Sequence, residues 1–98
     1  MEYSENGKID SKTMFRLIRE LWYESNYGEE PMKNVAYRIY EVNKSGCKKN
    51  EVARSFKFLI DKGFIKEISK EPYCYEFTEM GRNIRTEKDV ENIINNTA

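Results

Sequence analysis

The sequence predicts a single α+β domain that is mostly α-helical, and three features of the 98-residue chain support this fold class. Apolar residues recur with the spacing of amphipathic helices in three segments before Gly63. Two short runs rich in β-forming residues follow, separated by Glu71-Pro72, and predict a hairpin. A last helical segment then ends the chain. A chain of this length has room for one hydrophobic core.

The first helix is expected from Ser11 to about Asn26. Asp10 is a suitable N-cap, and Ile9 and Met14 are spaced as a hydrophobic staple. Tyr27-Gly28 ends the segment. The predicted buried stripe comprises Met14, Leu17, Ile18, Leu21 and Trp22.

A second helix is expected with Pro31 in its first turn, where the missing N–H costs nothing. Its predicted buried stripe comprises Met32, Val35, Ala36, Ile39 and Val42. A third helix is expected from about Lys48 to Lys62, with Gly63 after its end. Its predicted buried stripe comprises Val52, Phe56, Leu59 and Ile60, and its opposite face comprises Lys49, Asn50, Arg54, Lys57 and Asp61.

The remaining chain predicts a hairpin followed by helix. The strands are expected at Phe64–Ser69 and Tyr73–Phe77. Thr78 is expected to cap a helix over Glu79–Arg85, and a second capping pattern at Thr86 and Asp89 restarts the helix. That helix carries Val90, Ile93 and Ile94, and we expect it to fray after Asn95.

The chain has no net charge, but its charges are unevenly distributed. Lys44 to Lys70 contains eight lysine and arginine residues against three carboxylates, a local charge of +5, whereas residues 1–30 and 71–98 each carry −3. A phosphate responds to charges within about 10 Å at ordinary salt, so the basic middle matters more than the total. The charge distribution by itself fits a nucleic-acid-binding face and a solvated lysine-rich helix equally.

Two segments resemble the winged helix-turn-helix family. Val52 to Ile65 resembles a recognition helix that runs into the first wing strand, and Tyr75 to Arg82 resembles the exit from the wing into the last helix. The resemblance covers residues 11–86, and in size the chain is similar to small regulators of archaea and their viruses. It implies three helices, a β wing of two or three strands and a C-terminal helix. The link from Asn43 to Cys47 is longer than the family's usual turn, and Glu71 lies at the wing tip.

The resemblance implies that the third helix enters the DNA major groove and that the hairpin contacts the adjacent backbone or minor groove. Arg54 and Asn50 suit bidentate readout of guanine and adenine. The helix lysines suit phosphates, as do the wing lysines, and Ser55 is expected to reach a phosphate from the helix edge. The expected DNA-contacting residues are Lys48, Lys49, Asn50, Arg54, Ser55, Lys57, Lys66 and Lys70.

Composition argues against an enzyme, a cofactor and a metal centre. The chain has no histidine and no glycine-rich phosphate loop, and neither cysteine has an activating partner. Cys47 and Cys74 are expected to be reduced, mostly buried thiols, with a disulfide as the alternative in a hyperthermophile. No apolar run is long enough for a membrane span, no small-molecule substrate is evident, and the polar start of the chain predicts a cytoplasmic protein.

We therefore expect a disordered segment at 1–10, a winged-helix DNA-binding domain at 11–86, and a C-terminal helix and tail at 87–98. The expected function is transcription regulation on double-stranded DNA. A winged-helix protein-interaction module and a non-specific architectural DNA-binding protein remain alternatives. A homodimer is favoured. The apolar residues of the C-terminal helix either belong to the core or form a dimer seam with Phe15, Trp22 and Tyr23. The tyrosines at 37, 40, 73 and 75 are expected mainly to pack at the core boundary, with nucleobase stacking as the alternative.

Overall fold

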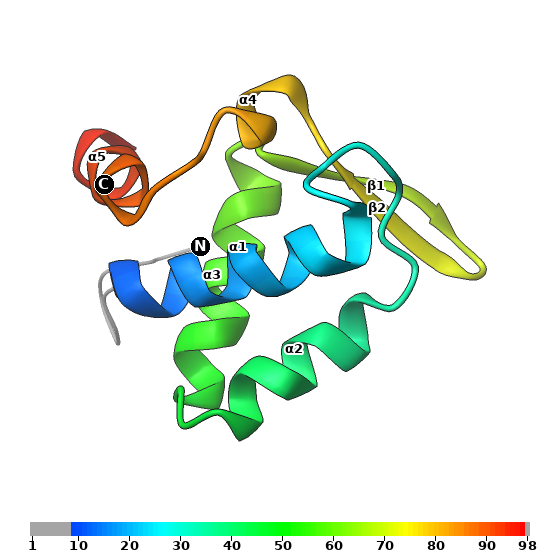
Figure 1. Ribbon diagram of the computed structural model, residues 1–98, viewed down its shortest axis with the longest axis horizontal. Helices are drawn as coiled ribbons and strands as arrows, with labels where there is room; N and C mark the ends of the chain where they lie inside the picture. The colour runs from blue at the N-terminus through cyan, green and yellow to red at the C-terminus, as the bar shows by residue number, and fades with distance from the viewer. Residues whose placement is uncertain (1–8, 98) are drawn as a thin grey trace.

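A computed structural model describes residues 9–97, which form helices around one core with a two-stranded antiparallel hairpin at one end (Figure 1). The mostly helical α+β class is therefore confirmed. The elements in chain order are α1 (Ser11–Ser25), α2 (Val35–Lys44), α3 (Lys49–Asp61), β1 (Ile65–Lys70), β2 (Tyr73–Phe77), α4 (Glu79–Arg82) and α5 (Glu87–Thr97).

Helix α1 is the centre of the fold and packs against α2, α3 and α5 (Figure 1). Its predicted stripe is confirmed, except that Trp22 is only half-buried. The largest fully buried side chains include Met14, Leu17, Ile18, Leu21, Met32, Leu59, Ile65 and Phe77. These residues come from both helices and strands, so a single core joins the whole described chain.

The start of α1 follows the local signals in the sequence. The Asp10 carboxylate accepts a hydrogen bond from the backbone N–H of Thr13 at 2.9 Å, as an N-cap should. Ile9 and Met14 are both buried in the core. The folded part thus begins at least two residues before the boundary expected at Ser11, while the rest of the expected disordered segment lies outside the described residues.

Helix α2 begins later than expected, because the preceding residues pair with the hairpin. Met32 and Tyr75 form an antiparallel bridge, with N–O distances of 2.6 and 3.0 Å in the two directions. The chain is therefore not helical at Pro31, and the prediction that Pro31 lies in the first turn is wrong. Ala36 is exposed rather than buried, whereas Val35 and Val42 of the expected stripe are buried.

An ionic contact fixes α2 against α1. The Arg38 guanidinium donates to Glu24 at 3.1 Å through Nε and to Glu20 at 3.4 Å through Nη1. The amide of Asn34 also donates to Glu24, at 3.2 Å. Three hydrogen bonds from two side chains, Arg38 and Asn34, therefore tie this helix to the second half of α1.

The third helix has nearly the expected bounds but a different rotation. Its buried residues are Val52, Ser55, Phe58 and Leu59. The expected stripe contained Phe56 and Ile60, which are only half-buried at the edge of the core. Phe56 instead packs edge-on against Tyr75 of β2, with the ring centroids 5.3 Å apart. Phe56 thus lies between the edge of the core and the hairpin.

The hairpin and α4 match the expected order. Strands β1 and β2 pair from Ile65–Phe77 to Lys70–Tyr73, with an irregularity between Glu67 and Ser69. Thr78 caps α4 as expected and accepts from the Gly81 N–H at 3.2 Å. Helix α4 ends at Arg82 rather than Arg85.

Helix α5 begins at the expected second capping pattern. The N–H of Asp89 donates to Thr86 Oγ1 at 3.2 Å, and the N–H of Thr86 donates back to the Asp89 carboxylate at 3.1 Å. The helix continues to Thr97, beyond the expected fraying point at Asn95. Val90 is fully buried, so α5 belongs to the same core as the preceding helices.

Candidate nucleic-acid interface

The outward face of α3 carries three of the DNA-contacting residues that the sequence placed opposite the core. Lys49, Asn50 and Lys57 are exposed, together with Ala53 between them. Residues three or four apart lie on one side of a helix, so these four side chains form a continuous strip along α3. We call Lys49, Asn50, Ala53 and Lys57 the α3 strip. It combines cations with an amide that has the donor and acceptor groups needed for a base edge.

Two carboxylates of α3 accompany this strip. Lys57 Nζ lies 3.2 Å from Asp61, one turn further along the same exposed side. Lys48 Nζ lies 3.9 Å from Glu51. Exposed pairs of this kind contribute roughly 0–1 kcal/mol, so a phosphate can take over the lysine at small cost. The carboxylates nevertheless reduce the positive field at both ends of the strip.

The structure separates Arg54 and Ser55 from the α3 strip. Arg54 is half-buried beside the strip, and its Nε is buried without a hydrogen-bond partner among the described residues. Ser55 is 0% exposed, and its Oγ is likewise buried and unpartnered in that part of the chain. The expected contact between Ser55 and a phosphate is therefore wrong, because the rotation of α3 turns this side chain into the core.

On the hairpin, the two expected lysines are exposed but differ in their surroundings. Lys66 lies directly opposite Glu76 in the strand pairing, and its Nζ is 3.1 Å from that carboxylate. Lys70 is exposed at the end of β1, next to Glu71 in the turn. The ion pair with Glu76 limits the attraction of Lys66 for phosphate, and Lys70 has an acidic neighbour in the sequence.

A groove of 420 Å³ adjoins the α3 strip at Phe56. It lies between the start of α2 and strand β2, which the bridge between Met32 and Tyr75 brings together. Lys33 is the one charged residue in its described lining. The lining comprises Lys33, Asn34, Val35, Ala36, Tyr37, Ile39, Phe56, Pro72, Tyr73 and Tyr75.

Tyrosines at this groove are more exposed than the sequence indicated. Tyr37 and Tyr73 are 55% and 61% exposed, and Tyr40 nearby on α2 is 58% exposed. The expectation of boundary packing is wrong for these three and holds for Tyr75, which is half-buried. Burial, with the charge of Glu67, raises the pKa of the Tyr75 hydroxyl, so this group remains a proton donor.

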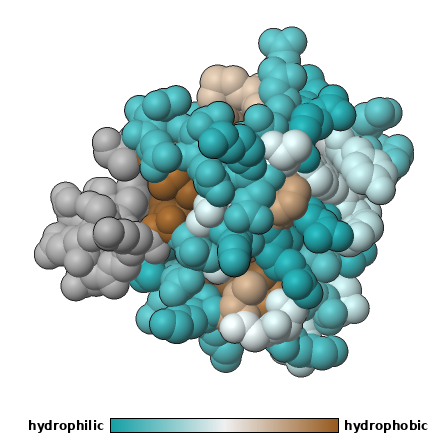
Figure 2. All heavy atoms as spheres, turned by 60° about the vertical axis from the view of Figure 1, so that its left-hand side comes forward, coloured by the Kyte–Doolittle hydropathy of each residue, from teal (hydrophilic) through white to brown (hydrophobic). Residues whose placement is uncertain are grey.

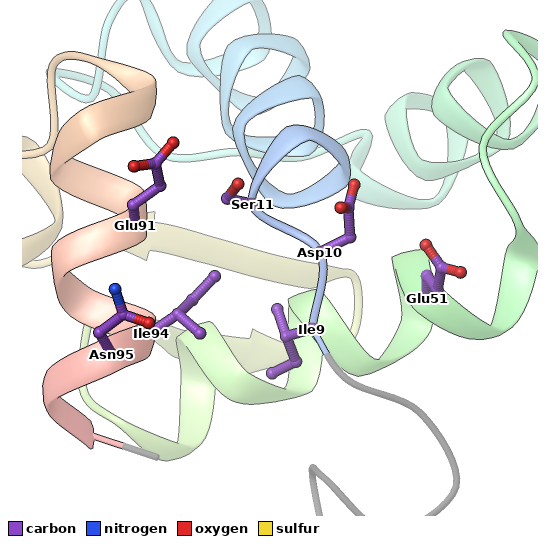
Figure 3. Close-up of a pocket in the computed structure, with 7 residues that line it drawn as sticks. All are labelled: Ile9, Asp10, Ser11, Glu51, Glu91, Ile94 and Asn95. Atoms are coloured by element: carbon purple, nitrogen blue, oxygen red, sulfur yellow. The ribbon is translucent and has the colours of Figure 1, made fainter.

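A second, acidic pocket of 510 Å³ lies where the starts of α1 and α3 meet α5 (Figure 3). Figure 3 shows Ile9 and Ile94 facing each other, with Asp10 and Glu51 to one side and Glu91 to the other. Thr13 Oγ1 is within hydrogen-bond distance of both Asp10 at 3.1 Å and Glu51 at 3.4 Å. Two of the three carboxylates are thus already engaged with α1.

The acidic pocket and the hairpin lie at opposite ends of the long axis of the molecule (Figure 1). The face that carries α5 is mostly hydrophilic in Figure 2, with its hydrophobic residues in separate small areas. Phe15 and Trp22, the expected dimer residues on α1, pack against the core edge with ring centroids 5.9 Å apart. The visible surface thus offers a dimer no broad apolar seam.

Other kinds of site have little support in the described residues. Over residues 9–97 there is no cluster of three or more metal-ligating side chains of the His, Cys, Asp and Glu types. Cys47 and Cys74 are half-buried and not bridged. Nor does any described helix have the length and apolar composition needed to cross a membrane. Comparison with protein-family models, with curated proteins and with solved structures found no match.

Proposed function

We propose that this protein is a winged-helix transcription regulator that binds double-stranded DNA through the α3 strip. The observation that carries the proposal is the exposure of Lys49, Asn50 and Lys57 on one side of a single helix. A helix of this width fits the major groove, where an amide can read an adenine edge and lysines can hold the phosphates on either side.

The remaining architecture supports the same orientation. The hairpin follows α3 directly and carries Lys66 and Lys70, so it would lie over the adjoining backbone when α3 enters the groove. The bridge between Met32 and Tyr75 extends the hairpin toward a third short strand, which is typical of winged helices. The acidic pocket adds nothing to this support, because its Glu51 belongs to the first turn of α3 and lies 3.9 Å from Lys48 Nζ.

The ion pairs assign different roles to the expected contacts. Lys49 has no ion pair within residues 9–97 and is the cation most available to a phosphate. Lys57 must exchange Asp61 for a phosphate, and Lys66 must exchange Glu76. Asn50 becomes the principal base-reading residue, because Arg54 is half-buried and reaches the groove only from the edge of the strip.

Fluorescence anisotropy on duplex DNA at several salt concentrations tests the proposal. Binding should tighten steeply as salt falls, and Lys49→Ala should weaken all sequences alike and lower the salt slope by about 1. Asn50→Ala should cost about 1–3 kcal/mol on the preferred sequence and less on others. Lys88→Ala, which removes the same charge from an exposed position on α5, should change neither.

Two outcomes would overturn this function or narrow it. If Lys49→Ala and Asn50→Ala both leave binding unchanged, α3 is not the reading helix. If Asn50→Ala weakens all sequences equally, the protein is an architectural DNA-binding protein without base preference.

A protein-interaction module is the second candidate, and the exposed aromatic residues at the end of α1 favour it. Tyr23 and Tyr27 are 57% and 67% exposed there. Large aromatic residues at the surface are enriched in protein interfaces. Absence of DNA binding at low salt, together with a partner that is lost on Tyr23→Ala, would establish this function instead.

We also propose a homodimer, because two-fold DNA sites favour one. Tyr23 is the exposed member of the expected seam, while Phe15 and Trp22 are half-buried. The solution mass, measured with and without DNA, decides between a dimer in free solution and one that forms only on adjacent half-sites.

A further inference from the structure

The tyrosine-lined groove beside the α3 strip has no role in the binding of intact duplex described above. We infer that this groove binds an unstacked nucleobase, so that the protein prefers a duplex with an adjoining single strand. The inference rests on the proposed DNA-binding function and names a further DNA structure that the same surface would recognise.

Aromatic side chains form much of the groove wall. Tyr37 comes from α2, Phe56 from α3 and Tyr73 and Tyr75 from β2, so aromatic rings line the groove from three elements. Aromatic rings stack on any base, which is why proteins that bind single strands use them. The groove volume of 420 Å³ and its open side leave these rings accessible.

The charges around the groove also suit a nucleotide. Lys33 is exposed at the groove, and no carboxylate belongs to its described lining. Two carboxylates lie close to this lining: Glu24, which accepts from Asn34 at 3.2 Å and from Arg38 at 3.1 Å, and Glu67, which lies opposite Tyr75 in the strand pairing. A nucleotide therefore finds a cation for its phosphate beside aromatic rings for its base, the combination typical of single-strand binding surfaces.

Two of the rings are held in place by neighbouring side chains. The Arg38 guanidinium lies 5.5 Å from the centre of the Tyr37 ring, and Glu24 fixes that guanidinium at 3.1 Å. Tyr75 is held edge-on by Phe56 at 5.3 Å. Rings that are ordered before binding lose less conformational entropy when a base stacks on them.

Continuity with the proposed duplex interface favours a nucleobase over other occupants. Phe56 lines the groove and lies three residues from Ala53 of the α3 strip, on an adjoining side of the helix. A strand that leaves the duplex at the α3 strip is therefore close to the groove. A second copy of the chain or a peptide would not benefit from this position next to a phosphate-binding strip.

The test compares a blunt duplex with the same duplex carrying a tail of about six unpaired thymidines, a length within the range that single-strand binding folds occupy. Anisotropy should show about tenfold tighter binding of the tailed DNA, the gain expected from stacking one base. Tyr37→Ala and Tyr73→Ala should each remove most of this preference and leave blunt-duplex affinity unchanged.

Two control variants keep the test specific. Tyr37→Phe should retain the preference, because stacking uses the ring and not the hydroxyl. Tyr23→Ala should also retain it, since Tyr23 is 57% exposed, close to the 55% of Tyr37, but lies on α1 outside the groove lining.

The outcomes separate this inference from the proposed function. Equal affinity for blunt and tailed DNA would overturn the inference and leave duplex binding intact. If the wild-type protein binds neither blunt nor tailed DNA, the inference and the proposed function are both overturned. Tight binding of the tailed DNA, lost in Tyr37→Ala, without affinity for blunt duplex would support the groove and overturn major-groove reading. A solution mass that doubles in wild type but not in Tyr73→Ala, with no preference for tailed DNA, would assign the groove to a second copy and overturn the inference.

Discussion

Gly81 approaches the carbonyl oxygen of Phe64 so closely that a Cβ at Gly81 would lie 2.0 Å from that oxygen. The approach connects α4 to the start of the hairpin, where Thr78 also holds the chain. The Thr78 N–H donates to the same Phe64 carbonyl at 3.0 Å, and its hydroxyl donates to the Gly63 carbonyl at 2.6 Å. The turn before β1 and the turn after β2 therefore form one packed unit at the base of the hairpin.

Gly81→Ala should destabilise the protein by about 3 kcal/mol, because backbone atoms on both sides must move to admit the methyl group. Urea unfolding followed by circular dichroism measures this loss. Gly46→Ala is the matched control. Gly46 has φ +105 but open space around its Cα. Gly46→Ala should cost only about 1–2 kcal/mol, because alanine would have to adopt a left-handed conformation there. Equal losses in the two variants would contradict the close approach at Gly81.

The contact between Arg38 and Glu24 should contribute measurably to stability. Its atoms are largely shielded from solvent, and Arg38 donates to two carboxylates. Arg38→Ala should destabilise the protein by about 1–2 kcal/mol, and a double-mutant cycle with Glu24→Gln should give a coupling of about 1 kcal/mol. The pair between Lys44 and Glu41 is a useful comparison, because it is more exposed and 3.9 Å long. A coupling there as large as that of Arg38 would contradict the prediction.

Removal of the buried hydroxyl of Ser55 should stabilise the protein or leave it unchanged. Its Oγ is buried and has no partner among the described residues, and an unsatisfied buried polar group costs about 1–3 kcal/mol. Ser55→Ala should therefore raise the free energy of unfolding by up to about 1 kcal/mol. DNA affinity should remain at the wild-type value. Weaker DNA binding by a stably folded Ser55→Ala protein would restore this residue to the interface.

Asp61 should oppose DNA binding, because its carboxylate lies 3.2 Å from Lys57 at the end of the α3 strip. Asp61→Asn should tighten duplex binding about threefold, as expected for removing one surface charge interaction of below about 1 kcal/mol. Glu91→Gln makes the same change in net charge at the acidic pocket and should leave affinity unchanged. Equal tightening in both variants would show that total charge, rather than the α3 strip, controls binding.

The start of α5 should lose stability in acid through Asp89. Hydrogen bonds from the backbone N–H groups of Arg85 and Thr86 lower the pKa of this carboxyl below its usual value near 3.8. A lowered pKa in the folded state stabilises the fold above the unfolded pKa, and this contribution disappears as pH falls through the folded value. The melting temperature of Asp89→Asn should therefore be lower than wild type at about pH 7 and approach it at about pH 2. A constant difference across this range would contradict the assignment.

Local signals in the sequence predicted most of the secondary structure. The caps at Asp10, Thr78 and Thr86 act on backbone groups within four residues, so they can be read without knowledge of the rest of the chain. The order of helices and strands follows in the same way from the spacing of apolar residues. The exposure of Lys49, Asn50 and Lys57 could be predicted for this reason, because they lie well away from any apolar stripe.

Contacts between distant segments decided the rest. Phe56 and Ser55 could not be assigned from spacing, because contacts with distant segments are not visible within one helix. Phe56 packs against Tyr75, nineteen positions later. The extended chain at Met32 depends on hydrogen bonds to the same strand. By itself, the sequence determined where α1, α4 and α5 begin and which side chains of α3 are polar. Only the tertiary structure decided which way α3 turns and that the tyrosines of α2 and β2 meet in one groove, because long-range packing has no signature within a single helical turn.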